Sequence, residues 1–198
     1  MRKIILASTS PYRQQLLKQL QVPFVTAAPD FAEVIDPHVA PALLVRHLAS
    51  GKVQSLADQY PDAVIIGSDQ LFVDQRGRTL GKAANERGAF KQLRQMAGRT
   101  HCFYTGLAVL DCRTGTMQAD HATFSVTLRE LSDKQIKDYL KRERPFDCAG
   151  SFKVEGLGIA LIEKMAGEDY NALIGLPLIK LVTMLKQVGI NVLQDSGE

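Results

Sequence analysis

Short apolar runs alternate with amphipathic stretches along most of the chain. The run Ile4–Ala7 is brief and continuous, which is typical of a strand buried on both faces. The run Ala63–Ile66 has the same character and is the most β-like segment, with Leu71–Val73 continuing it. Apolar residues recur at helical spacing over about 11–19, 42–57, 85–96 and 178–187. This interleaving of strands and helices predicts an α/β fold.

The second half of the chain indicates that the sheet is mixed. The segments 100–110 and 117–128 both favour strands, and the turn Asp111–Gly115 joins them as an antiparallel hairpin. Ser132 and Gln135 form the pattern of a capping box, which opens a helix to about Arg142. A further strand is expected over 159–163. We therefore expect a mixed, twisted sheet flanked by helices.

Composition narrows the class of protein. Of the 198 residues, 45% are hydrophobic, so a sizeable core can form, and the net charge of +3 is too small to indicate a nucleic-acid partner. No apolar run reaches about 18 residues and no signal-peptide segment is present, so no membrane partner is expected. The three cysteines form no CxxC pair, which favours reduced thiols and a cytoplasmic location.

The segment from Ser8 to Arg13 has the features of an anion site. It places a hydroxyl-rich turn directly after the first strand, and Ser10 before Pro11 is a typical helix start. The free N–H groups and the dipole of such a helix favour an anion, and Arg13 adds two directed donors. The same residues also fit a plain strand, turn and capped helix.

Asp69 is the strongest single candidate for chemistry. It follows the most buried strand and a glycine, so we expect it at the carboxyl end of a central strand, where ligands gather in open α/β sheets. A carboxylate there can hold a metal or accept a proton from water, although it could also cap a turn. Lys52 and Lys82 each follow a glycine and can approach a polyphosphate, or lie on the surface. Glu155 lies between glycines in an irregular segment that favours a functional loop.

Six motifs occur in an order that resembles the Maf family, and the resemblance reaches to about Val188. They are Ala7–Arg13, Gly67–Gln70, Gly81-Lys82, Tyr104–Gly106, Ala149–Gly156 and Asn171–Pro177. The resemblance implies a single inosine triphosphatase-like domain over 1–198, with a possible division into two lobes and a cleft between them. The details look most like the 7-methyl-GTP pyrophosphatase branch rather than the dTTP/UTP branch.

The resemblance also implies an activity and roles for individual residues. The activity is metal-dependent hydrolysis of a nucleoside triphosphate to the monophosphate and diphosphate, with Mg or Mn as the cation. The catalytic positions are matched by Asp69 as proton acceptor and by Lys52, Lys82 and Glu33, with Asp69 and Glu33 as metal ligands. The substrate-binding positions are matched by Ser8, Ser10 and Arg13 for the phosphates and by Tyr12, Gln70 and Glu155 for specificity. A homodimer is expected on the same ground.

The specificity positions suit a methylated guanine. The 7-methylguanine ring carries a positive charge, which an aromatic face at Tyr12 attracts. Glu155 could accept hydrogen bonds from the guanine edge, and Gln70 could add an amide contact. Two other functions stay open: the same reaction on dTTP, UTP or another non-canonical nucleotide, and a nucleotide-binding regulator of cell division without catalysis.

Overall fold

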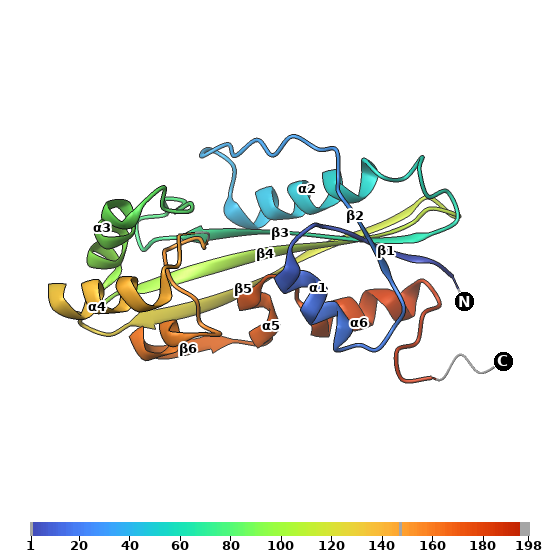
Figure 1. Cartoon of the computed structure of the whole chain (residues 1–198). Coiled ribbons are helices and arrows are strands. Elements are labelled where there is room, and N and C mark those ends of the chain that lie inside the picture. The colour runs from blue at the N-terminus through green and yellow to red at the C-terminus, as the bar shows by residue number, and fades with distance from the viewer. Residues whose placement is uncertain (1, 147, 195–198) are drawn as a thin grey trace. The chain divides into compact units, whose positions relative to one another are not determined.

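A computed structural model describes residues 2–146 and 148–194 and has the predicted α/β architecture (Figure 1). Six strands pair in the order β2-β1-β3-β4-β5-β6. The strands are β1 Ile4–Ala7, β2 Val25–Ala27, β3 Val64–Val73, β4 Thr100–Asp111, β5 Thr116–Leu128 and β6 Ile162–Gly167. The helices are α1 Pro11–Lys18, α2 Pro41–Gln54, α3 Glu86–Met96, α4 Asp133–Glu143, α5 Tyr170–Ile174 and α6 Leu178–Gln187, with a 3₁₀ helix, η1, at Leu157–Leu161. The two ends of the expected domain 1–198 lie outside the described residues.

The sheet is mixed, as the sequence predicts. Strand β1 runs parallel to β2 and β3, whereas β5 and β6 are antiparallel. The chain divides into two compact units. The first comprises the described residues within Met1–Gln70, Tyr104–Ala122 and Asp169–Glu198, and the second comprises Leu71–Phe103 and Thr123–Glu168 without residue 147.

In the first unit, helices cover both faces of the strands. Ile4 and Leu6 belong to a core cluster with residues of α1 and α6. Ile5 and Ala7 belong to a second cluster with residues of α2. Successive residues of a strand point to opposite faces, so a strand covered on both sides must be apolar at every position. This accounts for the continuous apolar run Ile4–Ala7.

The second unit has its own packed elements. Helix α4 begins with the predicted capping box, in which Ser132 and Gln135 bond each other's backbone N–H groups. Phe72, Phe103 and Phe152 form an aromatic cluster with ring centroids 4.3 to 5.9 Å apart. Buried aromatic rings of this kind contribute a large share of the packing energy of a small core.

Two predictions about the last third of the chain need correction. The strand expected over 159–163 is wrong, because η1 occupies most of it and β6 begins only at Ile162. The backbone at Gly158 lies so close to Lys153 that a Cβ there would be 2.2 Å from its carbonyl oxygen, and Glu143 accepts a hydrogen bond from the N–H of Leu157 at 2.8 Å. These contacts hold the segment in a tight turn. Helix α5, which the apolar pattern does not predict, is capped by the carboxylate of Asp169.

An ion pair between Arg2 and Asp111 ties the start of the first unit to the end of β4. Arg2 Nη1 donates to Asp111 Oδ2 at 2.7 Å, and this arginine holds the pKa of Asp111 below its ordinary value. The stabilisation is fully present above the unfolded pKa, about 4, and is lost as the pH falls through the folded pKa. We expect Arg2→Gln to lower the free energy of unfolding by about 1.5 kcal/mol at neutral pH.

Urea unfolding of the native chain and of Arg2→Gln at neutral pH and near pH 3 checks this expectation. The difference between the two proteins should shrink at the acidic pH. Arg113→Gln, at an exposed position on the same hairpin, is the matched control. An equal difference at both pH values would show that Asp111 does not depend on Arg2.

No helix in the described part of the chain combines the length and the apolar character that crossing a membrane requires.

Candidate active site

Asp69 lies inside β3 and not at its carboxyl end, which corrects the sequence prediction. The strand continues for four residues after Asp69, to Val73. The expected edge exists for a different reason: the pairing of β1 with β3 ends at Leu6 and Ile66, because β1 stops at Ala7. Asp69 therefore lies just past the carboxyl end of the parallel β1–β3 pair, in the position where open α/β sheets present their ligand-binding residues.

Lys52 of α2 joins the two carboxylates that the sequence singles out. Its Nζ lies 2.5 Å from Asp69 Oδ1 and 2.7 Å from Glu33 Oε1. Lys52 is 5% exposed and Asp69 6%, whereas Glu33 is exposed. Burial raises the pKa of Asp69 above its ordinary value, while Lys52 and then Arg13 act in the opposite direction. The result is a buried carboxylate that stays within reach of two cations.

Two glycines allow α2 to pack directly on the strands at this level. A Cβ at Gly67 would lie 2.7 Å from the carbonyl oxygen of Ala49, and a Cβ at Gly106 would lie 2.0 Å from that of Val45. Real Cβ atoms do not approach a carbonyl oxygen this closely, so any larger residue would push the helix away. The sequence motifs around both glycines therefore bring Lys52 to Asp69.

A third glycine places the loop that carries Glu33. A Cβ at Gly51 would overlap the ring of Phe31, at 2.2 Å, so the ring packs directly against this helical position. Phe31 also meets the ring of His47 at a centroid distance of 6.1 Å. Gly51 weakens α2 as an isolated helix. Its role here is to receive Phe31, which holds the loop so that Glu33 reaches Lys52.

The predicted capped helix at the start of the chain is confirmed. Ser10 caps α1, and its Oγ accepts the N–H of Arg13 at 3.4 Å. Ser8 Oγ accepts the N–H of Ser10 at 3.1 Å. A hydroxyl has one donor and two acceptor lone pairs, so each serine keeps its O–H for an anion while its oxygen is engaged. Tyr12 lies in the first turn of the same helix.

Arg13 is oriented by a residue distant in sequence. Its Nε donates to the carbonyl oxygen of Gly175 at 3.0 Å, and Ser68 Oγ lies 2.9 Å from the same oxygen. Burial lowers the pKa of Arg13, and the carboxylates of Asp69 and Glu33 offset part of that effect. With Nε engaged, the two terminal nitrogens are left for a ligand. Gly175 has φ 128°, a conformation that favours glycine.

Gln70 is engaged with α5. Its Nε2 lies 2.9 Å from Thr105 Oγ1, 2.9 Å from the carbonyl oxygen of Ala172 and 3.1 Å from that of Leu173. Carbonyl oxygens only accept, so the amide nitrogen faces α5. A base contact by Gln70 stays a prediction, and in this conformation only its Oε1 is left to make one. Thr105, which also donates to Ala172 at 2.7 Å, was not singled out individually by the sequence.

The first unit thus holds most of the predicted site residues, and the second holds two. In the first unit are Ser8, Ser10, Tyr12, Arg13, Glu33, Lys52, Asp69 and Gln70. In the second unit, Lys82 is exposed and its backbone bridges Ala149, while Glu155 is exposed in the turn before η1.

The carboxylate pair suits a hard divalent cation. Mg²⁺ in proteins is usually bound by one or two carboxylates together with substrate phosphates, and it keeps several waters. Glu33 and Asp69 both contact Lys52, and together they supply two carboxylates. Among the described residues, no group of three or more His, Cys, Asp or Glu side chains is arranged to hold a metal. A cation held by Glu33 and Asp69 together with substrate phosphates stays a prediction.

The chain is similar to known proteins over nearly its whole length. Residues 3–188 match the family model described as "Maf-like protein". A protein of Syntrophotalea carbinolica named 7-methyl-GTP pyrophosphatase is 58% identical over 197 residues, covering 100% of both chains. Proteins with the same name from Polaromonas sp. and Albidiferax ferrireducens are each 46% identical, covering 100% and 97% of this chain and 90% and 96% of their own.

Proposed function

The chain belongs to the Maf family, and from that premise we propose that it hydrolyses 7-methyl-GTP to 7-methyl-GMP and diphosphate. The observation that carries the chemistry is the bridge of Lys52 between Glu33 and Asp69. Relatives of this chain at 46 to 58% identity are named for the same substrate. In the proposed role the enzyme removes a modified nucleotide from the triphosphate pool.

The residues of the first unit divide the work of the reaction. Ser8, Ser10 and Arg13 bind the triphosphate, with two hydroxyl donors and the terminal nitrogens of a guanidinium held by Gly175. Asp69 accepts the proton of the attacking water, and burial, which raises its pKa, makes it a better base. Lys52 favours the ionised form of Asp69 and holds its carboxylate in place. Glu33 and Asp69 would hold a divalent cation, which would neutralise phosphate charge and lower the pKa of a bound water.

Specificity is assigned to three side chains by their family positions. Tyr12 contacts the charged face of the methylated base, where a cation–π interaction contributes about 0.5–2 kcal/mol. Glu155 accepts from the guanine edge, and Gln70 Oε1 supplies the remaining contact. Lys82 and Glu155 enter this proposal by resemblance, since they belong to the second unit.

The proposal includes a setting for the enzyme. It acts in the cytoplasm as a homodimer, with no nucleic-acid or membrane partner. Cys102, Cys112 and Cys148 are thiols rather than halves of disulfides, which supports a reducing compartment.

A substrate panel tests the proposal. Diphosphate release is measured for 7-methyl-GTP, GTP, dTTP and UTP, with Mg²⁺ or Mn²⁺ supplied in turn. We expect turnover of 7-methyl-GTP to be fastest, because its base is the one in the panel whose ring carries a positive charge for a cation–π interaction with Tyr12. Faster turnover of dTTP or UTP would move the chain to the other branch, and no release from any substrate would favour a binding protein without catalysis.

The contact between Gly51 and Phe31 gives a prediction far from the reacting atoms. Gly51→Ala should displace the Phe31 ring and detach Glu33 from Lys52, although alanine favours a helix. Misplacement by about 1 Å can cost roughly 100-fold in rate, so we expect a loss of about 10- to 100-fold in diphosphate release.

Gly88→Ala in α3 is the matched control, because a Cβ there meets its nearest neighbour at an ordinary 3.6 Å. It should leave the rate unchanged and raise stability by about 0.5–1 kcal/mol. If Gly51→Ala retained full activity, the loop of Glu33 would not depend on Phe31.

A further inference from the structure

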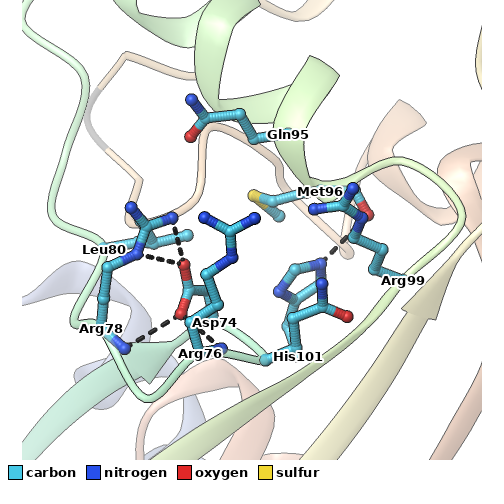
Figure 2. Close-up of a pocket in the computed structure, with 9 residues that line it drawn as sticks. Asp74, Arg76, Arg78, Leu80, Gln95, Met96, Arg99 and His101 are labelled. Carbon is cyan, nitrogen blue, oxygen red and sulfur yellow. Dashed lines mark hydrogen bonds and ion pairs between the residues drawn. The ribbon is translucent and has the colours of Figure 1, made fainter.

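A small cavity in the second unit is lined by three arginines (Figure 2). It lies beside the turn after β3 and the start of β4, and its volume is about 10 Å³. A cavity of that size holds one water-sized group. None of the roles in the proposed reaction uses these residues. The lining contains three arginines, Arg76, Arg78 and Arg99, and one carboxylate, Asp74, so it has an excess of positive charge.

Asp74 is fully committed to its own turn. It accepts from the N–H groups of Arg76 and Arg78, both at 2.9 Å, and from Arg78 Nε at 2.8 Å. Arg78 Nη2 lies 2.7 Å from the same carboxylate. The hydrogen bonds from Arg78 and Arg76 hold the pKa of Asp74 below its ordinary value. Asp74 therefore neutralises Arg78, and no ion pair within the described part of the chain compensates Arg76 or Arg99.

The guanidinium groups of Arg76 and Arg99 carry the remaining positive charge of the cavity. Among residues 2–146 and 148–194, neither Arg76 nor Arg99 has a carboxylate within ion-pair distance. Figure 2 shows the Arg76 side chain between Arg78 and His101, and the Arg99 side chain on the other side of His101 in that view. Two unpaired guanidinium groups at one cavity are a suitable setting for an oxyanion.

His101 supplies a buried group that lacks a partner. His101 is 2% exposed, and the centroid of its ring lies 5.6 Å from that of the Phe72 ring. Nε2 lies 3.0 Å from the carbonyl oxygen of Met96, so Nε2 carries the proton. Nδ1 is then an acceptor, and it is buried without a hydrogen-bond partner. A buried acceptor of this kind costs about 1–3 kcal/mol until a donor reaches it.

We propose that this cavity binds inorganic hydrogen phosphate, whose P–O–H donates to His101 Nδ1 while Arg76 and Arg99 bind its charged oxygens. The cavity has room for a single oxygen, so the rest of the anion lies at the mouth, where the arginines are exposed. The acceptor at the bottom sets the selectivity. Hydrogen phosphate keeps one O–H at neutral pH, whereas sulfate and a fully ionised phosphate monoester have none.

The test compares anions on the native chain at about pH 8, where a monoester is a dianion. The nitrogen NMR signal of His101 Nδ1 is followed during titration with inorganic phosphate, sulfate and methyl phosphate at constant ionic strength. We expect phosphate to shift and saturate this signal, and the other two anions to bind about tenfold more weakly. The double variant Arg76→Gln and Arg99→Gln should abolish the shift. Arg94→Gln, an exposed arginine of α3 that pairs with Asp133, should retain it.

Three results would overturn the site. Equal affinity for phosphate and sulfate would mean that Nδ1 does not select the ligand. Retention of the shift in the double variant would place the anion elsewhere. No shift of the His101 signal at millimolar phosphate would leave the cavity to water. Each of these results concerns only the cavity in the second unit. The proposed hydrolysis of 7-methyl-GTP is tested independently, by the substrate panel.

Discussion

Asp69→Asn is expected to slow diphosphate release from 7-methyl-GTP by about 100- to 10,000-fold. Asparagine has nearly the same shape but cannot accept a proton from water. It also offers a weaker ligand to a divalent cation. The loss should be in kcat more than in KM, because Ser8, Ser10 and Arg13 still hold the phosphates. Initial rates at saturating substrate measure it.

The matched control for this variant is Asp58→Asn. Asp58 is exposed just beyond α2, in the same unit, and should leave the rate unchanged. Thermal unfolding of both variants separates a lost base from a lost fold. A fully active Asp69→Asn would remove Asp69 from the role of proton acceptor.

Lys52→Met is expected to lower both activity and stability. The lysine is almost fully buried between Asp69 and Glu33, and its removal leaves the buried carboxylate of Asp69 without its closest cation. Breaking a buried ion pair by removing one partner costs about 3–5 kcal/mol. For a chain of this size, that corresponds to a fall in Tm of about 6–20 °C. Urea and thermal unfolding measure the loss.

A double variant tests whether this cost comes from the unpaired carboxylate. Combining Lys52→Met with Asp69→Asn removes the buried charge, so stability should recover in part while activity stays lost. Lys18→Met, at an exposed position at the end of α1, is the control for loss of a lysine charge. A double variant as unstable as the sum of the two single variants would show that Lys52 does not act through Asp69.

The elements that carry a local signal could be predicted from the sequence. Strand β1 is covered on both faces, so its apolar run is continuous, and α6 has an apolar stripe that gives its bounds at Leu178–Gln187. The capping residues Ser10 and Ser132 each bond a backbone N–H three residues away. Each of these signals lies within one segment of the chain.

The features that the sequence did not predict depend on contacts between distant segments. Gly51 looks like a weakness in α2 until Phe31 is seen packed against it. Gln70 looks like a base contact until its amide nitrogen is found on α5, a short helix held by one aspartate cap and by side chains from other strands. Asp69 was expected at the carboxyl end of its own strand, but the edge at which it lies is set by where the neighbouring strand β1 ends.

The position of the cut in the triphosphate tests the central claim most directly. The native chain is incubated with 7-methyl-GTP and a divalent cation, and the products are separated and identified. The proposed roles of Asp69, Lys52 and Arg13 predict 7-methyl-GMP and diphosphate in equal amounts, with no free phosphate. Formation of 7-methyl-GDP and phosphate, or recovery of unchanged 7-methyl-GTP, would contradict the account.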